Sequence, residues 1–232
     1  MKSFSVLTVS ARTGWEDIAN ASIAVQTVQP KAWYLVSRLM ESFNACQAIP
    51  IQEPKKTKVS NLNAALNAGL NFIDTEYVIF YQDFISLDSD CFEKLLALVD
   101  ENTFVTTCTP NYDNSDDSRY LGVDVPRECR PEEWEANVAI APMKAIYELG
   151  GFDEDYDNGW SWDNVNLAER AALLGYKFII DESNRPTLFP HPRLETNMEL
   201  NLDRHTETMR KIKTGEKDIK LPYVRPLNYS AS

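Results

Sequence analysis

The residues with the clearest chemical potential are carboxylates next to strand-like or helix-like segments. Asp83 comes three residues after the apolar run Tyr77–Phe80. In open α/β sheets, ligands bind just beyond the carboxyl ends of the strands. A carboxylate there could hold a divalent metal ion against phosphate groups, because Mg²⁺ and Mn²⁺ prefer oxygen ligands. The alternative is a turn-forming or capping Asp without a ligand.

His191 could complete the same metal site from a distant part of the chain. It lies between two prolines within Leu188–Pro192, and imidazole suits Mn²⁺ as a ligand. A partly buried histidine with a backbone partner is the alternative. His205 lies on a polar stretch of the C-terminal tail and is expected to be solvated. The sequence thus predicts Mn²⁺ or Mg²⁺ on Asp83 and His191.

Asp163 is the candidate catalytic base. It opens an expected helix, where an Asp can also serve as an N-cap. Trp160 and Trp162 come just before it, and indole rings beside a carboxylate suit the stacking of a sugar and the bonding of its hydroxyl groups. The carboxylate could take the proton of an attacking hydroxyl. We therefore predict both tryptophans as an acceptor-binding platform, with core packing as the alternative.

Strands that alternate with helices would position these residues. Strands are expected over Phe4–Val9, Ala32–Val36, Tyr77–Phe80, Phe104–Thr107, Asn137–Ala141 and Tyr176–Ile180, and helices over Asp17–Thr27, Leu62–Ile73, Asp88–Val99, Met143–Leu149 and Asp163–Leu174. This alternation predicts an α/β fold with a largely parallel sheet. Pro110–Trp134 is expected to be a functional or mobile loop. We predict one domain over residues 1–191 and a C-terminal extension over 192–232.

Composition narrows the function classes. The 232 residues include 23 Lys and Arg against 35 Asp and Glu, which gives a formal net charge of −12. This balance argues against broad, sequence-independent nucleic-acid binding, because such binding depends on Lys and Arg that neutralise phosphates. The sequence has no apolar run long enough for a membrane span, and its start is a poor signal peptide. We therefore expect a cytoplasmic protein, and nothing in the sequence indicates its oligomeric state.

The order of several motifs resembles the GT-A glycosyltransferases, most closely the family 2 group. The resemblance covers roughly Phe4 to His191. The matching segments are Asn61–Gly69, similar to the family's "aLNaGl" helix, Glu76–Asp83, similar to its "eyvlflDxD" strand, Gly150–Glu154, which matches its GGFDE turn, and Trp162–Arg170, which resembles its "EDxDLxxR" helix start. The resemblance implies a Rossmann-like GT-A fold, in which helices flank a mixed, mostly parallel central sheet.

The resemblance also implies an activity and a donor site. The expected protein is a metal-dependent glycosyltransferase of the hexosyltransferase type. It would move a sugar from a nucleotide-diphosphate donor, a UDP-sugar, to a glycan or another hydroxyl acceptor with inversion. The residues implied for donor binding are Ser10, Arg12, Arg38, Lys58, Asn61, Gln82 and Asp83.

Three departures from the family pattern bear on this activity. Ser37-Arg38 stands where an Asp usually reads the nucleoside, and Gln82-Asp83 keeps only the last carboxylate of Asp-x-Asp. The Asp163-Asn164 pair is more like the Glu-Asn pair of some retaining enzymes that transfer N-acetylgalactosamine to polypeptides. Inversion and retention therefore both stay open. The other base candidates, which more readily fix a turn, are Asp153 and Glu154.

Two other functions stay open. The first is a GT-A transferase that acts on DNA with modified bases, for which the tail cations would have to form a local basic strip. Those cations are Arg204, Arg210, Lys211, Lys213, Lys217 and Lys220. The second is a non-catalytic module that binds nucleotide sugars or glycans, because the usual Asp residues are missing.

Overall fold

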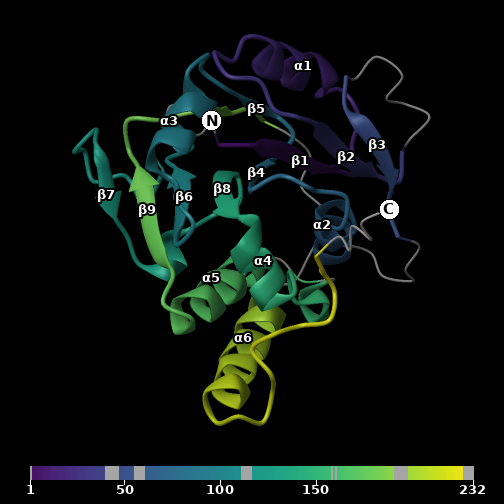
Figure 1. The fold of residues 1–232 in the computed structure, drawn as a ribbon, viewed down its shortest axis with the longest axis vertical. Helices are drawn as coiled ribbons and strands as arrows, with labels where there is room; N and C mark the ends of the chain where they lie inside the picture. Colours follow the sequence, from purple (N-terminus) through teal and green to yellow (C-terminus); the bar gives the residue numbers. More distant parts are fainter. Residues whose placement is uncertain are drawn as a thin grey trace, which may run out of the picture.

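A computed structural model gives the architecture and describes residues 2–39, 47–54, 61–110, 117–157, 159, 161–190 and 198–226. One eight-stranded sheet forms the centre, with helices on both faces (Figure 1). Its strands, in spatial order, are β3 (Ile49–Gln52), β2 (Trp33–Ser37), β1 (Phe4–Ser10), β4 (Tyr77–Tyr81), β8 (Val138–Pro142), β6 (Thr103–Thr107), β9 (Lys177–Asp181) and β7 (Pro126–Glu128). A separate pair consists of β5 (Ile85–Ser86) and β10 (Thr187–Leu188). The helices are α1 (Glu16–Ala24), α2 (Leu62–Leu70), α3 (Cys91–Leu98), α4 (Met143–Leu149), α5 (Asp163–Leu173) and α6 (Met198–Lys213).

The sheet is mixed and mostly parallel, as predicted. β3, β2, β1 and β4 run parallel to one another, and β6 is parallel to β9. β8 runs antiparallel between β4 and β6, so β4 and β6 point the same way. The carboxyl ends of β1, β2, β4, β6 and β9 therefore meet at one edge, where ligands of such sheets bind.

Two apolar cores hold the sheet between its helical layers. One core packs β-strand side chains such as Leu7 and Phe80 against α2, α4 and α5. The other packs alternate side chains, such as Val6 and Ile79, against α1 and α3. Side chains alternate between the two faces along a strand, so each central strand contributes to both cores. This explains why these strands read as continuous apolar runs.

Four strands were not expected from the sequence. β3 and β7 are short and mostly exposed, and β5 and β10 have only two residues each. β7 lies inside the expected loop Pro110–Trp134 and pairs antiparallel with β9 at the sheet's end. Short edge strands carry little periodic signal, because their pairing partner and not their own sequence stabilises them.

The C-terminal segment packs against the same body. After α6, the chain returns to the turn that follows α4, where the Leu221 and Val224 N–H groups donate to the carbonyls of Leu149 and Gly150. Val224 is buried in the core that contains α2, α4 and α5. Gly150 has a φ of 69°, and a Cβ there would overlap the Leu221 backbone. Among the described helices, none combines the length and the apolar character that a membrane crossing requires.

Candidate active site

The first part of the site lies where β1 and β4 end. Leu7 pairs with Phe80, and continuing this register places Ser10 level with Asp83. Ser10 Oγ donates to Asp83 Oδ2 at 2.7 Å, and Arg12 Nη2 donates to Oδ1 at 2.6 Å. Arg12 Nε is 3.2 Å from Oδ2. Three of the predicted donor-site residues are thus brought together, with Asp83 only 2% exposed.

This arrangement bears directly on the predicted metal ion. Both carboxylate oxygens of Asp83 already face a guanidinium or a hydroxyl group, so a cation at this place would have to displace Arg12. Within the described residues, no group of three or more His, Cys, Asp or Glu side chains is arranged to hold a metal ion. The described residues by themselves therefore do not form a binding site for the predicted metal ion.

The predicted second ligand, His191, lies outside the described residues. The chain that leads to it does reach the end of β4. β10 pairs with β5, and the Phe189 N–H donates to the Phe84 carbonyl at 2.8 Å. Phe84 directly follows Asp83 and has a φ of 61°, a left-handed conformation that is uncommon for an aromatic residue. The metal site on Asp83 and His191 stays a prediction.

The second part of the site lies where β2 and β3 end, and it contains a carboxylate that sequence analysis missed. Glu53 is buried, and its backbone N–H donates to the carbonyl of Ser37 at the end of β2. Arg38 Nε lies 3.6 Å from Glu53 Oε2, and Asn61 Nδ2 donates to Oε1 at 3.3 Å. Lys58 lies outside the described residues. Glu53 thus supplies a carboxylate beside Ser37-Arg38, where the family's usual Asp is missing.

A chain of polar contacts runs from the end of β4 toward Asp163. The Gln82 N–H donates to the Asn137 carbonyl at 2.9 Å, and Asn137 Nδ2 donates to Glu135 Oε2 at 2.8 Å. The negative charge of Glu135 contributes to the raised pKa of Asp163. α5 packs on the sheet and leads by a short turn into β9, so it runs back along that strand, and its first residue, Asp163, lies toward the carboxyl ends of the strands.

Asp163 is the first residue of α5 and is 7% exposed. Burial raises the pKa of its carboxyl, and the negative charges of Asp157 and Glu135 raise it further, whereas the backbone N–H groups of Asp163 and Asn164 lower it. A carboxylate with a raised pKa takes up a proton more readily than an ordinary one. The N-cap position, which was the alternative interpretation of Asp163, is held by Trp162.

The residues just before Asp163 have an unusual backbone. Ser161 and Trp162 have φ values of 68° and 71°, both in the left-handed region. Trp162 is half-buried, with its indole centroid 5.1 Å from the imidazole of His205. Trp160 lies outside the described residues. The predicted acceptor platform therefore stays a prediction for both tryptophans.

The expectation for His205 was wrong. The residue is 6% exposed, because the polar face of α6 on which it lies packs against the loop before α5. The sequence hides this contact, since polar helix residues normally face solvent.

The alternative base candidates are engaged in structural contacts. Asp153 accepts from the Asp155 N–H at 3.1 Å and pairs with Lys217 Nζ at 2.6 Å. Glu154 Oε1 accepts from Asn67 Nδ2 at 3.2 Å. Both contacts fix the turn between α4 and α5, and Asp163 stays the predicted base.

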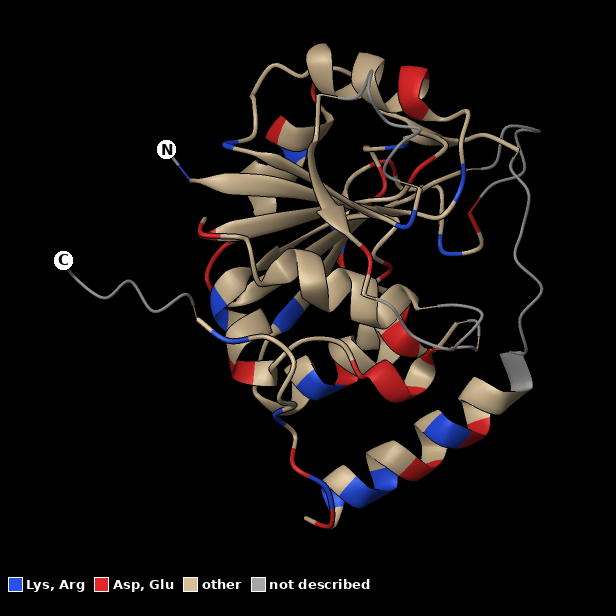
Figure 2. Ribbon diagram, turned by 90° about the vertical axis from the view of Figure 1, so that its right-hand side faces the viewer, with Lys and Arg blue, Asp and Glu red and all other residues tan. Residues whose placement is uncertain are grey.

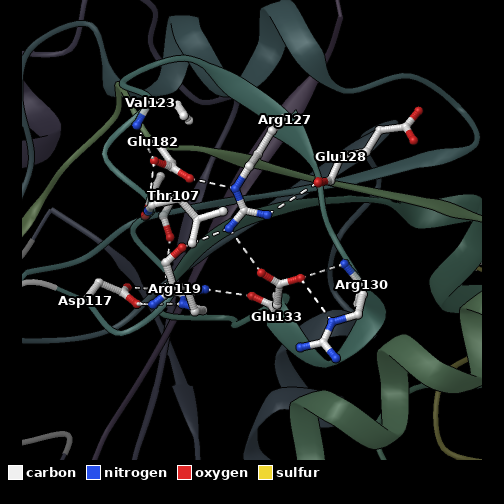
Figure 3. A network of polar contacts seen from close by, with 10 residues as sticks. Thr107, Asp117, Arg119, Val123, Arg127, Glu128, Arg130, Glu133 and Glu182 are labelled. Atoms are coloured by element: carbon white, nitrogen blue, oxygen red, sulfur yellow. Dashed lines mark hydrogen bonds and ion pairs between the residues drawn. The ribbon is translucent and has the colours of Figure 1, made fainter.

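A buried polar network closes the far end of the same edge (Figure 3). Arg119 Nε donates to Asp117 Oδ1 at 2.9 Å, and Arg119 Nη2 donates to the Thr107 carbonyl at 3.0 Å. Arg127 bridges Glu182 Oε1, at 2.6 Å, and Glu133 Oε1, at 3.0 Å. Residues 117–134 of the expected loop are therefore tied to the ends of β6 and β9.

The fold is shared with solved glycosyltransferase structures. No protein-family model and no curated protein matches the chain by sequence. A structure of GalNAc-T7 with UDP, GalNAc and Mn²⁺ aligns over 90% of this chain and 48% of its own, with a TM-score of 0.65 and 12% identity. S. aureus TarS aligns over 82% of this chain and 37% of its own, with a TM-score of 0.61 and 12% identity.

A shorter TarS fragment, residues 1–349 in complex with UDP, aligns over 91% of this chain and 72% of its own. Its TM-score is 0.60 and its identity 11%. The chain thus has the GT-A glycosyltransferase fold, as its motifs predicted. It spans about half the length of the GalNAc-T7 chain.

Proposed function

We propose that this protein is a glycosyltransferase that transfers a sugar from a uridine diphosphate donor to a hydroxyl group of a glycan or another acceptor, with inversion. The observation that carries the proposal is the placement of two different buried carboxylates at one sheet edge. Asp83 is paired with the guanidinium of Arg12, whereas burial and nearby negative charges raise the pKa of the Asp163 carboxyl. Donor binding needs an oriented cation for the phosphates, and proton transfer needs a carboxylate that can take up a proton.

The donor would lie across the ends of β2, β1 and β4. Glu53, Arg38 and Asn61 surround the nucleoside side, where a buried carboxylate can accept hydrogen bonds from a base or ribose. Arg12, with its side chain 25% exposed, faces the diphosphate side. A guanidinium binds phosphate oxygens with two parallel hydrogen bonds. Ser10 and Asp83 orient that guanidinium from behind.

Asp163 would act on the acceptor. Its carboxylate takes the proton from the acceptor hydroxyl as the oxygen forms a bond to the anomeric carbon of the donor sugar. The bond from that carbon to the diphosphate breaks, and the electron pair leaves with the nucleoside diphosphate. The positive charge of Arg12 stabilises the charge on the leaving group. Trp162 would shape the acceptor side.

Mn²⁺ or Mg²⁺ on Asp83 and His191 remains part of the proposal as a separate prediction. When bound, such an ion would supply further positive charge at the diphosphate. No step above depends on it, because Arg12 faces both oxygens of Asp83.

The DNA-directed alternative receives little support from the charge pattern. Figure 2 shows basic and acidic residues interspersed along α6. Arg210 and Lys211 pair with Glu207, and Lys217 pairs with Asp153. A basic strip for phosphates would need these cations to be unneutralised.

The test is a thermal-shift screen of nucleotide sugars, followed by measurement of nucleoside diphosphate release with candidate acceptors. A saturating donor should stabilise the fold by ~2–4 kcal/mol. Release that depends on an acceptor would support the transferase. Tight donor binding without hydrolysis or transfer to any acceptor would favour the binding module instead. Stabilisation by no nucleotide sugar would overturn both.

A further inference from the structure

Helix α6 packs against the loop before α5 and against α5 itself through a mostly polar face, which is the reverse of ordinary helix packing. Its buried face consists of Asn201, His205, Thr208 and Met209. By contrast, Leu200 and Leu202 are 45% and 43% exposed. Packing driven by apolar burial would turn the leucines inward. A helix that buries an amide and an imidazole instead is held by specific hydrogen bonds, and such bonds fix the position of their partners.

Asn201 joins the two ends of the loop that precedes α5. Its Nδ2 donates to the carbonyls of Tyr156 and Ser161, both at 3.1 Å. Arg204 Nη1 donates to Asn201 Oδ1 at 2.9 Å, which fixes the orientation of the amide. The side chain fits against the loop because Gly159 has no Cβ, since a Cβ there would lie 2.2 Å from the Asn201 amide. These contacts therefore fix the span of the loop, which is the distance between Tyr156 and Ser161.

His205 supports the indole of Trp162. The two ring planes are tilted by 31°, with centroids 5.1 Å apart. His205 Nδ1 lies 3.4 Å from the Tyr156 hydroxyl, and Nε2 lies 3.4 Å from Glu169 Oε1. The imidazole is thus held at both nitrogens while one face supports the indole.

Backbone strain coincides with these contacts. Ser161 and Trp162 are both left-handed, and neither is a glycine. Such conformations persist only where the surrounding structure enforces them, and they concentrate at functional sites. Within the part of the chain that the structure describes, α6 contacts both residues, through Asn201 and His205. The next residue is Asp163.

We propose that α6 is the positioning element of the acceptor site. Asn201 sets the span of the loop, and His205 sets the plane of Trp162, so that the indole and the Asp163 carboxylate present one fixed geometry. Both are positioning residues, because they act through the loop and the indole. The role of this place as the acceptor site rests on the proposed function, whereas the fixed geometry of Trp162 does not.

Three variants of His205 separate its ring from its hydrogen bonds. His205→Phe keeps a flat ring under Trp162, His205→Gln keeps polar groups without a ring, and His205→Ala removes both. Leu202→Ala, on the exposed face of the same helix, is the matched control. The measurements are acrylamide quenching of Trp162 (the parent signal minus that of Trp162→Phe), donor affinity, and the acceptor KM and kcat.

We expect His205→Ala and His205→Gln to increase the quenching of Trp162 and to reduce kcat/KM for the acceptor by ~10-fold or more, because small misplacements of reacting groups are costly. Donor affinity should stay within twofold. His205→Phe should restore both the quenching and the acceptor kinetics, and Leu202→Ala should match the parent. If His205→Ala does not fold, the comparison of His205→Phe with His205→Gln tests the proposal.

Equal quenching of Trp162 in the parent, His205→Gln and His205→Phe proteins would overturn the proposal. So would an acceptor kcat/KM that is the same in all three. A parent protein that binds donor but transfers no sugar would refute the proposed function alone, because the quenching comparison still reports whether His205 positions the indole.

Discussion

Two buried carboxylates stand at the same edge of the sheet, and their surroundings are opposite. Asp83 accepts from Arg12 and Ser10, whereas Asp163 lies under the influence of the negative charges of Asp157 and Glu135. A carboxylate held by a guanidinium is fixed in place and neutralised. Burial and neighbouring negative charges raise the pKa of a carboxyl, so that its ionised form takes up a proton more readily. In the proposed function, identical side chains thus take the roles of a binding group and a base because their neighbours differ.

The two carboxylates also differ in how the fold positions them. Asp83 is placed by the register of two parallel strands, which is set by main-chain hydrogen bonds. Asp163 is placed by a strained loop and by α6, a helix from the end of the chain. The proposed donor-binding group is therefore positioned by the sheet alone, and the position of the proposed base depends on a segment that is distant in sequence.

The largest expected effect separates the base from the binding group. Asp163→Asn should keep the fold and the donor affinity but lower kcat by ~10²-fold or more, because an amide cannot accept the proton. Initial rates of nucleoside diphosphate release measure it. Asp155→Asn, an exposed carboxylate of the preceding turn, is the control and should match the parent. Turnover of Asp163→Asn within a few-fold of the parent would assign proton transfer elsewhere and revive the retaining mechanism.

The second prediction concerns the competition between Arg12 and a metal ion for Asp83. UDP should stabilise the protein more in the presence of Mn²⁺ than in the presence of EDTA, by up to ~2–4 kcal/mol at saturation. Asp83→Ala should abolish that difference. Arg12→Met should tighten Mn²⁺ binding, because it frees the carboxylate, while it weakens UDP binding without metal. Thermal shifts and titration calorimetry measure both. The same UDP stabilisation in Mn²⁺ and in EDTA would refute the predicted metal site and leave the proposed steps unchanged.

The third prediction concerns the nucleoside side. Glu53→Gln should weaken UDP binding by ~10-fold, because a hydrogen bond to a charged group contributes ~1.5–3 kcal/mol and an amide oxygen accepts less strongly. Calorimetric titration with UDP and with inorganic diphosphate gives the measurement and its control. Diphosphate binding should not change. An equal loss for both ligands would show that Glu53 supports the fold of the site and not the nucleoside.

The smallest expected effect is on stability. The folded-state pKa of Asp163 is raised, so its contribution to stability is fully present below the unfolded value of 3.8 and is lost as pH rises through the folded pKa. Asp163→Asn mimics the neutral form at every pH. Its Tm should exceed that of the parent at neutral pH, and the difference should shrink on acidification toward pH 4. A Tm difference that is independent of pH would contradict the buried, raised-pKa state of Asp163.

Much of the fold could be predicted from the sequence alone. The apolar strands and the amphipathic helices gave the α/β class, because burial on both faces of a parallel sheet requires apolar runs separated by crossover helices. The motif order gave the GT-A fold, which the solved structures confirm. Asp83 and Asp163 were found because each marks the boundary of a strongly periodic element.

The sequence by itself thus determined the sheet, its helices and the two carboxylates, since local pattern encodes local structure. Tertiary structure alone decided that Arg12 faces Asp83, that Glu53 lies beside Arg38, and that α6 buries His205. These contacts join residues that are distant in sequence or lie on weak, polar elements. No periodicity announces such contacts, because their stability comes from hydrogen bonds and charges whose partners meet only after the chain has folded.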